Sequence, residues 1–61
     1  MPYTILFEGE PASAYASFIE AARAALAMQK SRHVQINHVD GRSWVRVWDR
    51  KAKTYTMSAV K

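Results

Sequence analysis

Trp44, Arg46 and Trp48 occupy every second position of the stretch SWVRVWD in the C-terminal half of the chain. On a β-strand, alternate side chains leave the sheet on the same side, so this spacing predicts two indoles and a guanidinium on one face. Tryptophan and arginine are the residue types most enriched at binding hot spots. The pattern therefore predicts a binding surface.

Residues suited to catalysis or metal binding are sparse. His33 and His38 lie five residues apart, so on one strand they point to opposite faces and cannot share a metal ion. The chain has no cysteine, and no Ser-His-Asp spacing, glycine-rich phosphate loop or carboxylate pair is recognisable. Asp40 and Asp49 are better explained by the turn and the loop that they begin. The sequence indicates a protein that is not an enzyme and needs no metal or other cofactor.

Basic residues flank the tryptophan stretch. Residues 1–29 carry a net charge of −2 and residues 30–61 a net charge of +6, which gives +4 for the whole chain. Such asymmetry predicts a basic surface and an acidic partner, although excess charge also keeps small domains soluble. The candidate binding residues are Trp44, Arg46, Trp48, Arg42, Arg50, Lys51 and Lys53.

The length and composition predict one domain over residues 1–61. Sixty-one residues, 49% of them apolar, are close to the smallest chain in which a hydrophobic core can hold a fold unaided. No apolar run approaches the roughly 20 residues of a membrane span. The N-terminal MPYTILFEGEP has no basic leader or signal-type cleavage site, and the lack of cysteine fits a reducing compartment. We expect a soluble, cytoplasmic protein without a membrane partner.

A helix is predicted to begin between residues 10 and 13 and to end between residues 28 and 31. Pro11 suits its first turn, because the missing N–H has no partner there. The segment is rich in alanine and contains no further proline or glycine until after its end. Its apolar residues recur at three- and four-residue spacing, which is typical of one buried stripe. The stripe consists of Tyr15, Phe18, Ile19, Ala22 and Leu26.

The predicted order of elements along the chain is β-α-β-β-β, with one strand before this helix and three after it. The strands lie over residues 3–8, 33–39, 42–48 and 54–60, and the dipeptide Asp40-Gly41 suits a type I′ turn between the second and the third. A helical crossover should place the first strand parallel to a strand of the meander, with a right-handed connection. Its neighbour, the second or the fourth strand, stays open. The expected fold is α+β, with one helix packed on one face of a four-stranded mixed sheet.

Two orientations of the strand 42–48 are compatible with this fold. In the first, the helix covers Val45 and Val47, and the tryptophans lie on the open face. In the second, the tryptophans pack on the helix and Arg46 enters the core, where an unpaired charge costs several kcal/mol or more. We therefore expect the open-face arrangement, in which the exposed tryptophans mark an interface. The helix-covered face would also hold Ile5, Phe7, Val34, Ile36, Tyr55 and Met57, and the open face Thr4, Leu6, Gln35, Asn37, Thr54, Thr56 and Ser58.

The stretch GRSWVRVWDRKAKTYTMS, about a third of the chain, resembles the sheet of phage integrase arm-binding domains and of plant AP2 domains. In those families the strands enter the DNA major groove, and the helix follows the sheet, whereas here it precedes it. The resemblance implies that Arg46 contacts a base or phosphate and that the tryptophans pack on sugars or bases. The loop cations would hold phosphates.

The whole chain, in its size and its strand-helix-meander plan, resembles small anti-CRISPR proteins that bacteriophages direct against type I surveillance complexes. The resemblance implies an inhibitor of a host defence or other nucleic-acid-handling complex, acting in the host cytoplasm through the open sheet face and the basic hairpin loop. We favour this function because a dedicated DNA reader would carry a denser basic face. The partner would be a host protein or ribonucleoprotein.

Two other partners remain open at this point. The alternative function is a small DNA- or RNA-binding module that contacts nucleic acid through the strand of Trp44, Arg46 and Trp48. A homodimer in which Trp44 and Trp48 of two copies meet across a two-fold axis on the open sheet face is compatible with both functions.

Overall fold

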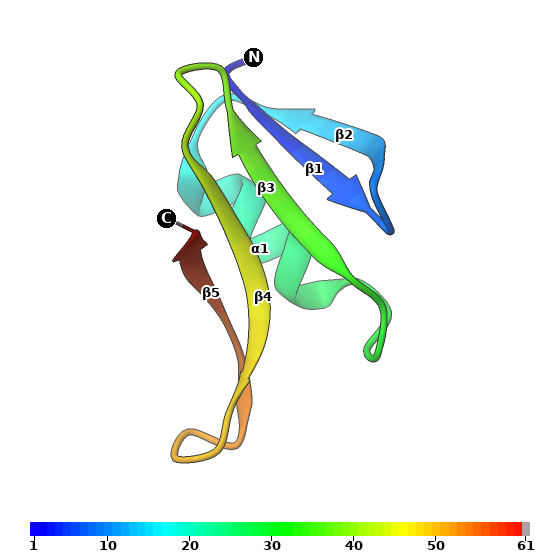
Figure 1. The fold of residues 1–61 in the computed structure, drawn as a ribbon, viewed down its shortest axis with the longest axis vertical. Helices are drawn as coiled ribbons and strands as arrows, with labels where there is room; N and C mark the ends of the chain where they lie inside the picture. Colours follow the sequence, from blue (N-terminus) through cyan, green and yellow to red (C-terminus); the bar gives the residue numbers. More distant parts are fainter. Residues whose placement is uncertain (61) are drawn as a thin grey trace.

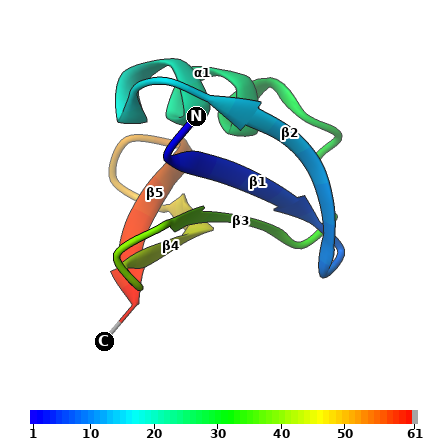
Figure 2. The same ribbon diagram turned by 90° about the horizontal axis from the view of Figure 1, so that it is seen from above.

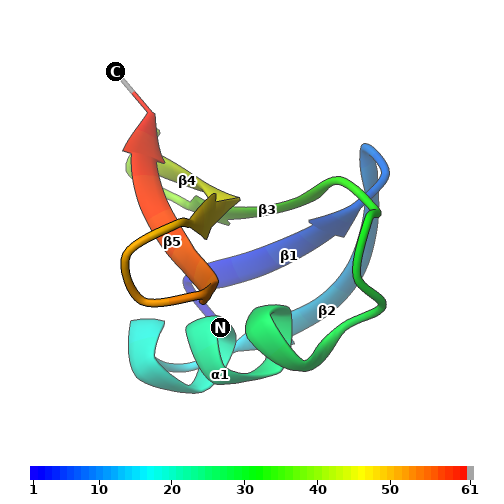
Figure 3. The ribbon, with the colours of Figure 1, turned by 90° about the horizontal axis from the view of Figure 1, so that it is seen from below.

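The computed structural model describes residues 1–60, which form one helix and a five-stranded antiparallel sheet (Figure 1). The sheet curves, and the helix lies on its concave side (Figures 2 and 3). The expected α+β class with one helix is confirmed, whereas the expected four-stranded mixed sheet is wrong. The sheet order is β2-β1-β3-β4-β5. The elements are β1 (Tyr3–Phe7), β2 (Glu10–Tyr15), α1 (Phe18–Ala27), β3 (Val34–His38), β4 (Ser43–Asp49) and β5 (Thr54–Val60).

The additional strand, β2, occupies residues that were expected to begin the helix. Glu8 and Gly9 adopt φ angles of 53° and 88°, and Phe7 pairs with Glu10 across them. Positive φ at both central residues is typical of a type I′ hairpin turn, so the chain folds back along β1. Pro11 is tolerated because β2 is an edge strand, where a missing N–H need not cost a ladder bond.

This hairpin also explains why β1 is not parallel to its neighbour in the meander. The helical crossover starts from β2, and β2 and β3 both run antiparallel to β1, which lies between them. The strands joined through the helix are therefore parallel to each other but not adjacent. The crossover rule holds, but it applies to β2 and β3 rather than to the first strand.

The helix α1 is shorter than expected, and a different side of it is buried. Ser17 is its N-cap and accepts a hydrogen bond from the N–H of Glu20 at 3.3 Å, which satisfies one of the free N–H groups of the first turn. Ala21 and Ala25 are fully buried, whereas Ile19 and Leu26 of the expected stripe are 69% and 37% exposed. Small side chains thus face the sheet and allow it to approach the helix closely.

The core lies between α1 and the centre of the sheet. Ile5 on β1 opposes Ile36 on β3, and both side chains are fully buried. The buried cluster consists of Ile5, Ala21, Ala25, Val34 and Ile36, packed against Tyr3, Phe7, Tyr15, Phe18, Ala22, Ala24, Met28, Trp44 and Met57.

No helix within residues 1–60 is long and apolar enough to cross a membrane.

The loop between β3 and β4 is one residue longer than a type I′ turn. The N–H of His38 donates to the carbonyl of Arg42 at 2.8 Å, and the N–H of Gly41 donates to the carbonyl of His38 at 3.0 Å. These bonds close a loop of three residues, 39–41, in which Gly41 takes a φ of 100°. Three-residue hairpin loops require a glycine-like conformation at this last position.

This loop length decides which face of the sheet each side chain of β4 occupies. Ile36 opposes Trp44, whereas a two-residue turn would have placed it opposite Val45. A one-residue change of register moves every side chain of a strand to the other face. Trp44 and Arg46 therefore face the helix, and Val45 and Val47 lie on the open face. The expected open-face position of the tryptophans is wrong.

Candidate functional site

Trp44 is part of the core rather than of a binding surface. Its ring centroid lies 4.6 Å from that of Phe18 and 6.0 Å from that of Tyr3. The guanidinium of Arg42 lies 5.6 Å from the centroid of the same indole. The side chain thus joins β4 to the start of the helix, and its role is structural.

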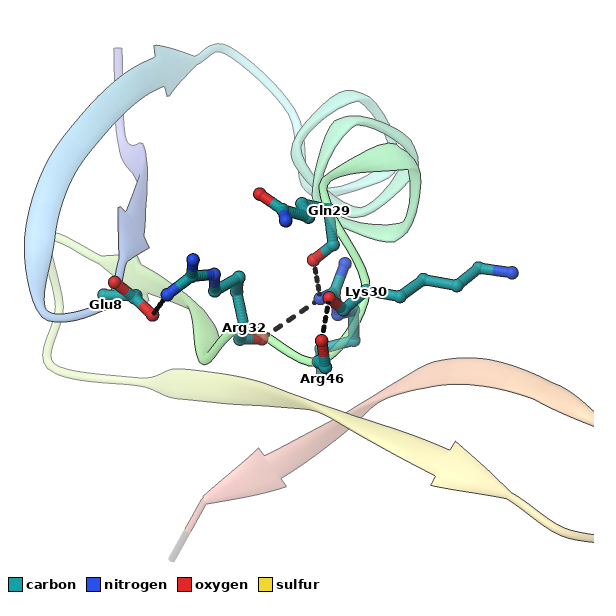
Figure 4. A network of polar contacts seen from close by, with 6 residues as sticks. Glu8, Gln29, Lys30, Arg32 and Arg46 are labelled. Atoms are coloured by element: carbon teal, nitrogen blue, oxygen red, sulfur yellow. Dashed lines mark hydrogen bonds and ion pairs between the residues drawn. The ribbon is translucent and has the colours of Figure 1, made fainter.

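Arg46 is only 9% exposed and holds the end of the helix (Figure 4). Within residues 1–60 its guanidinium donates to four backbone carbonyls. Nη1 donates to Ala25 and Met28, both at 2.8 Å. Nη2 donates to Gln29 at 2.7 Å and to Arg32 at 3.1 Å. These partners span the last turn of α1 and the loop that follows it.

The end of α1 explains why a charge is tolerated there. The last carbonyls of a helix have no partner within it and carry the negative end of the helix dipole. The last turn of α1 contains no basic residue, and the C-cap Met28 is extended, at φ −70° and ψ 162°. Arg46 supplies from β4 both the donors and the positive charge. Among the described residues, only its Nε is a buried side-chain polar atom without a partner.

Trp48 is the tryptophan whose side chain is exposed to solvent. It is 52% exposed, and its ring meets that of Tyr55 edge-on, with centroids 5.1 Å apart. Tyr55 is in turn held from the inside, because the guanidinium carbon of Arg46 lies 4.8 Å from its ring centroid. The hairpin of β4 and β5 extends beyond the C-terminal end of α1 (Figure 1). The indole of Trp48 therefore packs on Tyr55, which packs on Arg46, and about half of its surface stays exposed to solvent.

The loop beyond Trp48 carries three exposed cations, from Arg50, Lys51 and Lys53. The nearest acidic group, Asp49, is engaged in shaping this loop. Its Oδ1 accepts the N–H of Lys51 at 2.9 Å and that of Ala52 at 3.2 Å. We call Trp48, Tyr55 and these three cations the hairpin tip.

Arg42 lies at the other end of β4 and belongs to a different cluster. Its Nε is 2.7 Å from Oδ2 of Asp40, and Oδ1 of Asp40 is 2.8 Å from Nδ1 of His38. The N–H of Arg42 donates to Asp40, and this bond, followed by the His38 and guanidinium contacts, lowers the pKa of Asp40 to about 2. The cluster closes the β3–β4 loop.

The structure therefore separates the expected site residues. Trp48, Arg50, Lys51 and Lys53 gather at the hairpin tip, whereas Trp44 and Arg46 lie inside and Arg42 lies at the opposite loop. Tyr55 was missing from the expected site. The signal for it is the four-residue loop 50–53, which places Tyr55 directly opposite Trp48.

The open face of the sheet lacks the expected tryptophans and arginine. Gln35 and Asn37 lie near its centre, and the side-chain amide of Gln35 donates to Asn37 at 2.7 Å. Val45 and Val47 lie on this face, where Trp44 and Trp48 were expected. A homodimer through this face can therefore not be built on the tryptophans.

Residues 1–60 form no detectable pocket and no group of three or more histidine or acidic side chains placed to hold a metal ion. The hairpin tip is thus a projecting surface, and the chemistry it offers is an aromatic face beside fixed positive charge. Comparison with known proteins found no family model, no curated protein and no solved structure that matches this chain.

Proposed function

We propose that this chain is a non-enzymatic binding protein that holds single-stranded nucleic acid at the hairpin tip. The observation that carries the proposal is the half-exposed indole of Trp48, held against Tyr55 next to three exposed cations. Proteins that bind single strands combine these two features, an aromatic platform for bases and a basic surface for phosphates.

The packing behind Trp48 supports this function. A side chain that is already ordered loses little conformational entropy when a base stacks on it. The row from the helix end through Arg46 and Tyr55 provides that order. Stacking of one base on an aromatic side chain contributes about 1–3 kcal/mol.

The charge distribution favours a polyanion as the partner. Arg50, Lys51 and Lys53 follow Trp48 within five positions, and the chain as a whole carries +4. Such charge attracts phosphates over a distance and raises the association rate at low salt. A single strand fits better than a duplex, because stacking on Trp48 needs a base whose face is free.

The test is the anisotropy of a labelled oligothymidine titrated with the protein at several salt concentrations. Trp48→Ala should weaken binding about fivefold or more, since the loss of one stacked base costs about 1–3 kcal/mol. Lys51→Ala should lower the slope of log K against log salt by about 0.7 if it contacts one phosphate. A duplex of the same length should bind more weakly than the single strand.

Two variants on the helix serve as matched controls. Ile19→Ala removes an exposed apolar side chain, and Arg23→Ala removes an exposed cation, both on α1. Neither should change the affinity or the salt slope as the tip variants do. Equal losses in the tip and helix variants, or no binding by the wild type at low salt, would contradict the proposal.

The inhibitor role implied by the resemblance to anti-CRISPR proteins stays a prediction. An inhibitor with this hairpin tip would occupy the path along which its target complex holds nucleic acid. An oligonucleotide in excess should then compete with the complex for the wild-type protein, and Trp48→Ala should weaken the binding to the complex as well.

A further inference from the structure

The two edge strands of the sheet differ in how far they are protected against pairing. The β2 edge contains Pro11, which has no N–H, begins with the charged Glu10, and shifts register between Ile5 and Leu6 of its neighbour. Proline, charge and irregular register are the devices by which proteins block edge pairing. The β5 edge has none of them: Thr54–Val60 contains no proline, glycine or charged residue and pairs with β4 without a shift. The helix α1 packs near β5, but no further strand of residues 1–60 pairs with its outer edge (Figures 1 and 3).

The register shows which backbone groups of β5 point outward. The N–H of His38 donates to the carbonyl of Arg42, so Arg42 directs its backbone groups toward β3. Backbone directions alternate along an antiparallel strand, and Val45 and Val47 therefore direct theirs toward β5. Their partners there are Ser58 and Thr56. The N–H and C=O groups of the intervening residues Tyr55, Met57 and Ala59 thus point away from the sheet.

We propose that β5 pairs with β5 of a second copy of this chain, antiparallel and about a two-fold axis at Thr56. In this register the outward groups of Tyr55 bond with those of Met57 in the second copy, and the reverse. Thr56 meets Thr56 on the open face, where cross-strand threonine pairs are favourable. The tyrosine ring lies beside the methionine sulfur on the helix side, another favourable contact.

The charges of the chain leave the β5 edge as a surface where a second copy meets little repulsion. Each copy carries +4, so most surfaces of two copies repel each other. The seven residues of β5 are neutral, and the Thr56 register places Lys53 opposite Ala59, not opposite another cation. The opposite edge, β2, is blocked, so two copies form a closed dimer instead of an open chain of β2–β5 contacts.

The small core is a second reason for self-association. Among residues 1–60, five apolar side chains are fully buried, and two of them are alanines. Domains of this size commonly gain stability from oligomerisation. Val60, which is 47% exposed, would come to lie opposite Ala52 of the second copy. The dimer holds whether or not the hairpin tip binds nucleic acid.

The first test is hydrogen exchange of the wild-type protein at high and low concentration, read per residue by NMR, together with sedimentation equilibrium. In the dimer, the outward amides of Tyr55 and Met57 should exchange at least tenfold more slowly at high than at low concentration. The amide of Thr56 bonds to β4 in both states, so it should be protected at low concentration as well and should depend on concentration less than the outward amides. A sedimenting monomer at the highest soluble concentration, with exchange independent of dilution, would overturn the proposal.

The second test uses a charge at the two-fold axis. Thr56→Lys brings two like charges face to face in a closely spaced pair, and the dimer dissociation constant should rise at least tenfold. Thr4→Lys adds the same charge to the same face but on the interior strand β1, away from the β5 edge, and it should leave the dimer intact. Dimerisation that survives Thr56→Lys would show that another surface is responsible and would also overturn the proposal.

Discussion

Replacing Arg46 by methionine tests the account of the helix end most directly. Methionine keeps the length and much of the apolar stem of the side chain but removes the charge and all of its donors. The carbonyls of Ala25, Met28, Gln29 and Arg32 then lose their common partner. Their environments differ, and this difference determines the expected cost.

The magnitude follows from what can replace each bond. Gln29 and Arg32 lie at the surface, so water can satisfy their carbonyls. The bond to Ala25 is buried, and an unsatisfied buried carbonyl costs about 1–3 kcal/mol. Loss of the cation at the helix end costs up to about 2 kcal/mol more, and the relief of desolvation offsets part of the sum. We expect a loss of about 2–4 kcal/mol from a domain whose size allows about 3–9 kcal/mol in all.

The assay is reversible unfolding in urea and by heat, followed by far-UV circular dichroism. A loss of 2 kcal/mol should lower the Tm by at least about 8 °C in a domain of this size. Arg46→Lys retains the charge, but its single ammonium cannot span the same carbonyls, so its Tm should fall between those of wild type and Arg46→Met. Arg50→Met, in the exposed loop directly after β4, is the control and should stay near wild type.

Three results would refute this reasoning. If Arg46→Met unfolds at the wild-type urea midpoint, the buried guanidinium contributes nothing net to stability. If Arg46→Lys and Arg46→Met lose the same amount, the positive charge at the helix end has no effect. If Arg50→Met loses as much as Arg46→Met, the cost reflects the removal of any arginine near β4 and not the bonds at the helix end.

Three further predictions concern other parts of the chain. Trp44→Ala should destabilise the fold by about 3–5 kcal/mol because it opens a cavity in the core, whereas Trp48→Ala should unfold near the wild-type temperature; similar melting curves for both would contradict their assignment to core and surface. The folded-state pKa of Asp40, about 2, lies below its usual 3.8, so its contribution to stability is complete above about pH 4 and is lost as the pH falls toward 2; Asp40→Asn should remove this part of the acid dependence in urea titrations. Gly41→Ala should cost about 1–2 kcal/mol at φ 100° although no atom lies within 4 Å of the new methyl group; an unchanged urea midpoint would mean that the loop can adopt another conformation.

The strands of the meander were predictable because their sequence signals are local. Thr54–Val60 agrees with the expected bounds, and Val34–His38 and Ser43–Asp49 differ from them by one residue at each end. The facing of Ser43–Asp49 was not predictable from its own residues. Both of its rows contain large apolar side chains, and the charge of Arg46 favoured the open face for the tryptophan row, but one residue of loop length decides the opposite.

Two expectations around the helix were wrong, each for a physical reason. Glu10–Tyr15 contains proline, alanine and serine, which suit a helix start, yet pairing with β1 makes it a strand, since sheet formation depends on neighbours more than on intrinsic preference. The cost assigned to a buried Arg46 assumed an unpaired charge. The missing clue was the helix end itself, which has neither a glycine cap nor a basic residue in its last turn.

The position of Arg46 has a consequence for the order in which the chain folds. Its bonds to Ala25 and Arg32 join residues 21 and 14 positions apart, so they require α1, β3 and β4 to be in place together. Contacts of this kind form late in folding, because the loops between the elements must first lose conformational entropy. The last turn of α1 should therefore stay frayed in the folding transition state. The guanidinium then lowers the rate at which the native chain unfolds and has little effect on the rate at which it folds. Its contribution is therefore to the kinetic stability of this small domain.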